Sequence, residues 1–157
     1  MQSKAILGGA LAAAAGVCGC GRPLPPAVLE AESGWARWRL EQGEVDAAVA
    51  AGADLVRRSG GASYARLGLA AALYRRGDLR GAEEQYRLVL AAEADSAPAL
   101  FNLGRVLLDQ GRASEGRALL ERFVARHGAA FPELAAKAQA AAGAAAQIGR
   151  ASCRERV

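Results

Sequence analysis

Apolar residues recur along the middle of this chain at the spacing of amphipathic helices. Leu69, Leu73 and Tyr74 fall on one face of a helix, and Tyr86 and Val89 do the same in the segment that follows. Short polar stretches separate these segments, so each stretch is expected to join two antiparallel helices. The expected helices lie near residues 29–41, 45–58, 63–76, 79–92, 97–110 and 113–126.

The helix pairs repeat with a period of 34 residues. Gly43, Gly77 and Gly111 are spaced by this period, and each falls between the two helices of a pair. Glycine is suited to this place because it adopts the left-handed conformation that ends a helix without strain. The same period relates a column of small residues and a pair of prolines, namely Ala36, Ala70 and Gly104, and Pro98 and Pro132. A period of this length predicts a stacked array with an extended surface.

In these columns the chain resembles the tetratricopeptide repeat. The best match is the second unit, with Leu69-Ala70, Leu73-Tyr74, Gly77-Asp78-Leu79, Ala82 and Tyr86 at the family's positions. The resemblance covers roughly residues 29–130 and implies an all-α solenoid of three helix-turn-helix repeats, at 29–62, 63–96 and 97–130. The first unit departs from the pattern, since Arg39 and Gly52 stand where aromatic residues are usual.

An alanine-rich segment follows the third repeat. Pro132 suits the first turn of a helix, and the residues after it are strong helix formers. We therefore expect a further helix within residues 131–147. Repeat arrays need a terminal element over their last apolar face, and this capping helix would provide it.

The N-terminus has the features of a secretory signal. Lys4 precedes an apolar stretch, Ala5 to Val17, that is too short to span a bilayer comfortably. Residues 1–20 then end in a sequence that resembles a bacterial lipobox, which implies lipidation of Cys20. Ordinary secretory cleavage and an uncleaved anchor are the alternatives. Residues 21–28 are proline-rich and are expected to form a stiff tether.

The C-terminal ten residues, 148–157, differ abruptly in composition from the alanine-rich segment. They resemble the translation of a widely used sequencing-adapter oligonucleotide, so we expect them to be non-native and the true C-terminus to lie elsewhere. The formal net charge of the whole chain is +4. Without Lys4 and without the three arginines and one glutamate of this tail, 16 basic and 15 acidic residues remain. A nearly neutral module gives no reason to expect nucleic-acid binding.

The repeats lack the residue patterns of enzymes and of metal sites. The single histidine, His127, has no partner at ligand spacing and reads as a helix-end residue. A serine–histidine catalytic pair would have to use this same histidine, because the chain has no other. No glycine-rich phosphate loop is present. We expect no enzyme activity, cofactor, metal or small-molecule substrate.

The tetratricopeptide resemblance implies that the first helix of each pair lines a concave groove. The positions that match give the expected partner-binding residues Arg37, Tyr64, Leu67, Tyr74, Arg75, Phe101, Asn102 and Arg105. Aromatic side chains supply contact area there, and Arg and Asn supply hydrogen-bond donors. The alternative is that Leu67 and Phe101 only complete the packing within their repeats. The family's carboxylate clamp is not reproduced in these positions.

These observations predict a membrane-tethered interaction scaffold. The repeats would bind a peptide or protein partner, as in envelope assembly, secretion or pilus biogenesis. The expected location is the bacterial cell envelope, lipid-anchored at the outer membrane or periplasmic face, or secreted to the periplasm if Cys20 is not lipidated. The alternative function is an N-terminal binding module of a longer protein that carries a catalytic domain.

Overall fold

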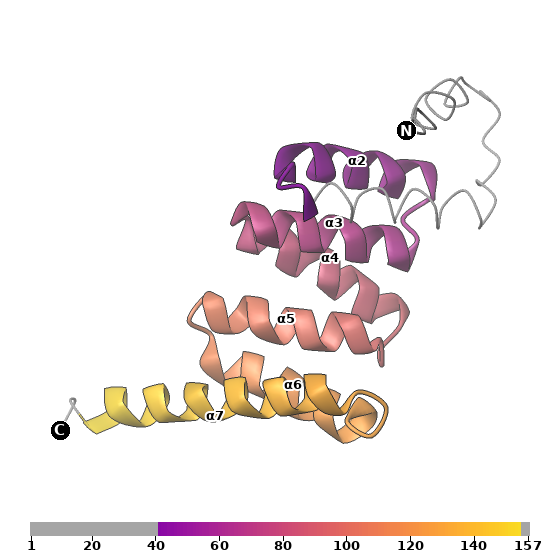
Figure 1. The fold of residues 1–157 in the computed structure, drawn as a ribbon. Helices are drawn as coiled ribbons and strands as arrows, with labels where there is room; N and C mark the ends of the chain where they lie inside the picture. The colour runs from indigo at the N-terminus through magenta and orange to yellow at the C-terminus, as the bar shows by residue number, and fades with distance from the viewer. Residues whose placement is uncertain (1–40, 155–157) are drawn as a thin grey trace, which may run out of the picture.

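The computed structural model describes residues 41–154, with side chains described for residues 41–144, as a row of α-helices stacked in chain order (Figure 1). No strand occurs in this part of the chain, so the described residues are all-α. The helices are α2 (Val45–Arg58), α3 (Ser63–Arg76), α4 (Leu79–Ala92), α5 (Ala97–Asp109), α6 (Ala113–His127) and α7 (Pro132–Arg154).

The helices predicted over 45–58, 63–76 and 79–92 have the observed bounds of α2, α3 and α4. The ends of α5 and α6 each differ from the expectation by one residue. All but the last residue of the helix expected over 29–41 lies outside the described residues, as do the signal segment 1–20 and the tether 21–28.

The repeated glycines adopt the left-handed conformation that their spacing predicts. The φ angles of Gly43, Gly77 and Gly111 are 80°, 88° and 78°. After Gly77, the N–H of Asp78 donates to the carbonyl of Leu73 at 2.9 Å, which closes the end of α3. The N–H of Arg112 closes the end of α5 in the same way. Each repeat therefore reverses its direction at a glycine.

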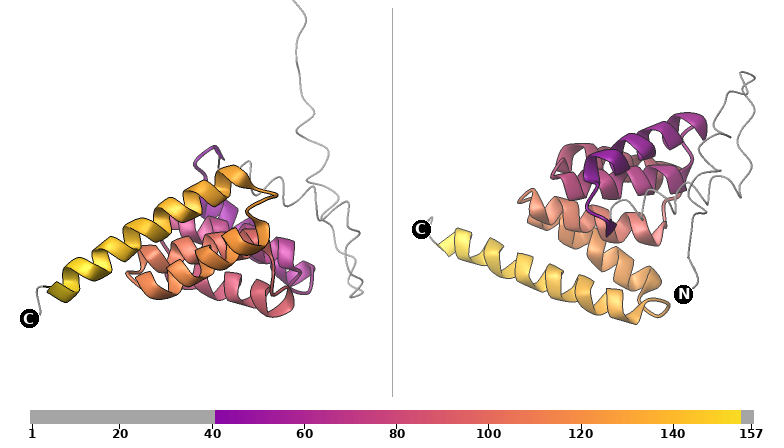
Figure 2. Two further views of the ribbon diagram at one scale, coloured as in Figure 1. Left: turned by 90° about the horizontal axis from the view of Figure 1, so that it is seen from below. Right: turned by 45° about the horizontal axis from the view of Figure 1, so that its top comes forward.

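The contacts between helices show how the stack curves. Each helix contacts the next one in the chain, and α3 also contacts α5, as α5 contacts α7. Among the described helices, α2, α4 and α6 make no contacts with one another. The helices α3, α5 and α7 therefore lie closer together than α2, α4 and α6 do, and we call the side of the stack that they form the first-helix face. Figures 1 and 2 show the order of the helices in the stack.

The core of the described residues consists of neighbouring clusters, and each cluster is shared between adjacent repeats or between a repeat and the helix beside it. One cluster of buried side chains joins α3, α4 and α5, and a second joins α5, α6 and α7. The largest fully buried side chains belong to the columns of the repeat or lie next to them: Tyr86, Phe123, Leu100, Leu107, Leu120, Val89 and Val106. Because neighbouring repeats share these clusters, none of them buries its apolar face alone.

Small residues let the two helices of the third repeat approach closely. A Cβ atom added to Gly116 would lie 2.7 Å from the carbonyl oxygen of Gly104, and one added to Gly104 would lie 2.8 Å from the side chain of Leu120. The second repeat places alanines in the same columns, and both Ala70 and Ala82 are fully buried. Larger residues in these columns would force the helices apart.

The last helix is longer than expected. The sequence places a capping helix within 131–147, whereas α7 continues to Arg154 and includes seven residues of the segment 148–157 that is expected to be non-native. Alanine is the strongest helix former, and no proline follows Pro132. Figure 2 shows the end of α7 extending beyond the rest of the stack.

Gly77, which follows the last residue of α3, and Gly68, within α3, provide a test of the turn geometry. A Cβ atom added to Gly77 or to Gly68 would meet nothing within 4 Å, but only Gly77 has a positive φ. We therefore expect Gly77→Ala to lower the free energy of unfolding by about 1–2 kcal/mol. Gly68→Ala, in the middle of α3, is expected to raise it by about 0.5–1 kcal/mol. Urea denaturation followed by circular dichroism measures both values, and equal effects of the two substitutions would contradict the turn assignment.

Candidate functional site

Three side chains of α3 and α5 join on the first-helix face. The hydroxyl of Tyr74 donates to Oδ2 of Asp109 at 2.6 Å and accepts a hydrogen bond from Arg105 at 3.1 Å. The guanidinium carbon of Arg105 also lies 5.3 Å from the centre of the Tyr74 ring, within the range of a cation–π contact. The hydrogen bond to Asp109 and partial burial raise the pKa of the Tyr74 hydroxyl, so it remains a donor at neutral pH.

Phe101 connects this cluster to the core of the third repeat. Its ring lies 5.9 Å from the guanidinium carbon of Arg105 and 5.3 Å from the ring of Phe123. Phe101 is only 9% exposed and belongs to the buried cluster of α5, α6 and α7. The Phe101 ring therefore packs against the guanidinium of Arg105, and little of the ring itself is accessible to a partner.

An apolar cavity of about 300 Å³ lies beside Phe101, where α5, α6 and the start of α7 meet. Most of its lining side chains are apolar, and Asn102 supplies a polar amide: Ala97, Pro98, Phe101, Asn102, Phe123, Phe131 and Leu134. Phe131 is one of two large apolar side chains that are exposed in the described part of the chain, with 44% of its surface accessible. The cavity therefore opens at an exposed aromatic side chain.

The other residues expected in the groove have different surroundings. Arg75 is exposed near the end of α3, and Leu67 is partly buried against the core of α3, α4 and α5. The hydroxyl of Tyr64 is covered, and no described residue hydrogen-bonds to it. Arg37 and the expected lipidation site Cys20 lie outside the described residues.

The structure adds residues that the sequence analysis did not single out. Phe131 and Leu134 line the cavity although they lie beyond the three repeats. The register could have indicated them, because Pro132 repeats Pro98 and so places the start of α7 beside the start of α5. Asp109, two residues before the turn glycine Gly111, matches a groove position of the repeat pattern, and the structure adds the hydrogen bond that it accepts from Tyr74.

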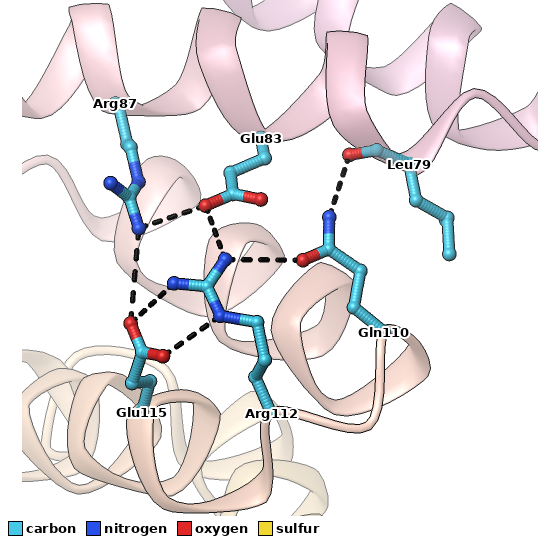
Figure 3. Close-up of polar contacts among 6 residues, drawn as sticks. All are labelled: Leu79, Glu83, Arg87, Gln110, Arg112 and Glu115. Carbon is cyan, nitrogen blue, oxygen red and sulfur yellow. Dashed lines mark hydrogen bonds and ion pairs between the residues drawn. The ribbon is translucent and has the colours of Figure 1, made fainter.

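A second cluster, polar throughout, joins α4 of the second repeat to the turn of the third repeat and to α6 (Figure 3). Arg112 donates to Glu83 at 2.6 Å and pairs with Glu115, and Arg87 lies 2.8 Å from the same Glu83 oxygen. Gln110 donates to the carbonyl of Leu79 at 3.2 Å. This cluster borders a polar cleft of about 720 Å³. Because its charges pair with one another, we interpret it as a link between repeats.

The ion pairs of this link change the titration of its acids. Partial burial of Glu83 alone would raise its pKa, but the hydrogen bond from Arg112 and the charges of Arg87 and Arg112 outweigh burial and lower it. The hydrogen bond from Arg112 likewise lowers the pKa of Glu115. Both carboxylates are therefore ionised at neutral pH, which keeps the link intact.

A third polar contact ties α6 to the connection between α4 and α5. Arg122 donates to the carbonyl of Ala94 and to the carboxylate of Asp95, both at 2.8 Å. Nε2 of His127 lies 2.7 Å from the carbonyl oxygen of Asp95. His127 thus holds a loop, and within the described residues no group of three or more His, Cys, Asp or Glu side chains is arranged to hold a metal ion.

The search for membrane spans covers the described helices alone. None of them combines the length and the apolar composition that crossing a bilayer requires.

No protein-family model and no curated protein matches this sequence. Solved structures of similar shape do exist. The type III secretion chaperone SycD of Yersinia enterocolitica, in complex with a peptide of the translocator YopD, is similar with a TM-score of 0.72 at 18% identity. The match covers 82% of this chain and 99% of that chain.

Two further structures extend the comparison. PcrH from Pseudomonas aeruginosa has a TM-score of 0.72 at 21% identity, over 80% of this chain and 96% of PcrH. The tetratricopeptide domain of Sgt2 from Aspergillus fumigatus has a TM-score of 0.74 at 13% identity, over 86% of each chain. Likeness at these identities concerns the fold. The chain folds as an all-α solenoid of the tetratricopeptide type, as its repeat pattern predicts.

The link between repeats predicts a dependence of stability on pH. A carboxylate whose pKa is lower in the folded state stabilises the fold above its unfolded pKa, and this contribution is lost as the pH falls through the folded pKa. We expect Glu83→Gln to lower the free energy of unfolding by about 1 kcal/mol at pH 7. The difference from the wild type should shrink between about pH 5 and pH 3.

Glu84→Gln is the matched control, because Glu84 is the exposed neighbour on the same helix and takes no part in the link. Urea unfolding of the wild type and both variants at pH 7 and pH 3 makes the comparison. A Glu83→Gln deficit that is unchanged at pH 3, or that Glu84→Gln reproduces, would refute the assignment.

Proposed function

We propose that this chain is a non-enzymatic scaffold that binds a peptide segment of a partner protein across the first-helix face. The observation that carries the proposal is the cluster of Tyr74, Arg105 and Asp109, which joins α3 to α5 on that face. An exposed arginine held over two aromatic rings is a common anchor in protein interfaces, because it presents several donors in a fixed orientation.

The cluster is already ordered before a partner arrives. The hydroxyl of Tyr74 is fixed on both sides, by Asp109 as acceptor and by Arg105 as donor. Ordering a long side chain on binding costs about 0.5–1.5 kcal/mol, and a side chain that is held in advance avoids much of that cost. The first-helix face therefore suits recognition better than the polar cleft, where Glu83 and Arg112 are engaged with each other.

The solved structures of similar shape support this proposal. SycD was determined with a peptide of the translocator YopD, and PcrH with the chaperone-binding regions of PopB and of PopD. Those proteins hold segments of other proteins on the same fold. By analogy of fold, we propose a protein or peptide partner for this chain and no small-molecule substrate.

We further propose that the chain is tethered to a membrane of the bacterial cell envelope through a lipid on Cys20. The support is in the sequence: a short apolar stretch, a sequence similar to a lipobox and a proline-rich tether before the repeats. The tether would hold the first-helix face away from the lipid surface. Envelope assembly, secretion and pilus biogenesis are processes in which such a scaffold would serve.

Site-specific photo-crosslinking tests the binding face. A benzophenone side chain at position 102, on the first-helix face, should give covalent adducts with a partner protein in bacterial cells. The same group at position 84, exposed on α4, is the matched control and should give none or far fewer. The additional substitution Arg105→Gln should reduce the adducts formed from position 102. Equal adducts from both positions would contradict the proposed face.

Metabolic labelling with palmitate tests the tether. The wild-type chain should be labelled and should float with membranes in a density gradient, and Cys20→Ala should lose both properties. Cys18→Ala is the control, because Cys18 lies before the expected cleavage site. A Cys20→Ala protein that still carries label and still floats would exclude the lipid anchor at Cys20.

A further inference from the structure

The α5 helix carries both a charged and an apolar feature on one stripe. Pro98, Phe101, Asn102, Arg105 and Asp109 follow one another at intervals of three or four residues, with Phe101 and Asn102 adjacent in sequence. They therefore share one side of the helix. The apolar cavity lies at the beginning of this stripe, and the arginine follows it. A bound segment on this face would meet both.

The two charged residues on this stripe differ in their polar partners. Arg105 and Asp109 are the only charged residues of α5. The carboxylate of Asp109 already accepts the hydrogen bond from Tyr74. Arg105 is exposed, makes one described hydrogen bond, to a neutral hydroxyl, and forms no ion pair with a described residue. Arg75 on the adjacent helix is also exposed without an ion pair among these residues.

We propose that the partner segment is an extended peptide with an acidic side chain for Arg105 and an apolar side chain for the cavity beside Phe131. A carboxylate matches the planar donors of a guanidinium and would give Arg105 the direct ion pair that it lacks among the described residues. An apolar side chain would remove the exposed ring of Phe131 from water and fill a cavity whose walls are mostly apolar. This inference rests on the proposed function, since it names the chemistry of that partner.

The spacing of the two features sets the spacing in the peptide. The α5 residues that line the cavity lie three to eight positions before Arg105, which corresponds to about 5–12 Å along the helix axis. Side chains two residues apart in an extended chain lie on one side of it and are separated by about 7 Å. The expected signature is therefore an acidic and an apolar residue separated by one other residue.

Selection of peptides by the full chain tests this inference. The probe is a phage-displayed library of random linear peptides, panned against the immobilised protein. We expect the selected peptides to be enriched in Asp or Glu next but one to Leu, Ile, Met or Phe. Affinity for a selected synthetic peptide, measured by fluorescence anisotropy, should fall as the salt concentration rises.

Two substitutions with matched controls assign the contacts. Arg105→Gln should weaken binding of the selected peptide by about five- to tenfold and remove most of its salt dependence. Arg80→Gln changes an exposed arginine of α4 and should have no effect. Phe131→Ser should weaken binding to a similar degree, whereas Leu88→Ser, which changes the other exposed large apolar side chain, should not.

The outcomes separate the inference from the function on which it rests. If no peptide is enriched above the background of an unrelated protein, the proposed binding of peptides is itself wrong. If peptides are enriched but lack the acidic and apolar pair, or if Arg105→Gln and Phe131→Ser bind them as tightly as the controls do, the chemistry inferred here is wrong and the binding function stands. Circular dichroism of each variant shows whether the fold is retained.

Discussion

The close approach of two helices at small residues is the constraint on which this structure depends. At Gly104 and Gly116 the helices of the third repeat come so near that one added methyl group would collide with backbone. At Ala70 and Ala82 the second repeat meets the same demand with fully buried alanines. This closeness lets Leu120, Phe123 and their neighbours form one core cluster of α5, α6 and α7. Larger residues in these columns would move α5 away from its partners, and with it every side chain of the stripe that carries Arg105.

Different interactions stabilise the two sides of the stack. On the first-helix face, α3 and α5 touch directly, and the contact between them includes the ordered group of Tyr74, Arg105 and Asp109. On the other side the described second helices do not touch one another, and Arg112, in the turn of the third repeat, forms ion pairs with Glu83 of α4 and Glu115 of α6. Aromatic contacts and hydrogen bonds on the first-helix face persist at high salt, whereas exposed ion pairs weaken. A rise in ionic strength is therefore expected to weaken mainly the contacts on the side of the stack opposite the first-helix face.

The sequence predicted most of the fold because the positions of the repeat mark where its helices begin and end. Glycine at a fixed period, aspartate after it and apolar residues at helical spacing determine where α3 and α4 begin and end. The same register placed Tyr74 and Arg105 on one face. It could not give the contact between Glu83 and Arg112, because these residues are 29 positions apart and no period relates them. It placed the end of the last helix at residue 147, whereas α7 continues to Arg154, because alanine is a strong helix former and no proline follows Pro132. The burial of Phe101 and the cavity at Phe131 depend on how three helices meet, which no single helix pattern contains.

The alanines that hold α7 have a consequence for the cavity. The helix packs on the stack mainly through Ala135, Ala138 and Ala142, whose methyl groups bury far less apolar area than leucine or phenylalanine would. Helices held by little buried area are the ones that detach at the lowest free energy. Phe131 and Leu134, which close one side of the cavity, are carried by this loosely held end. A side chain that enters the cavity would add the contacts that α7 lacks, so that amide exchange in the last helix would slow whenever the groove is filled. If a partner side chain fills the cavity, the ordering of α7 and the filling of the cavity are therefore coupled.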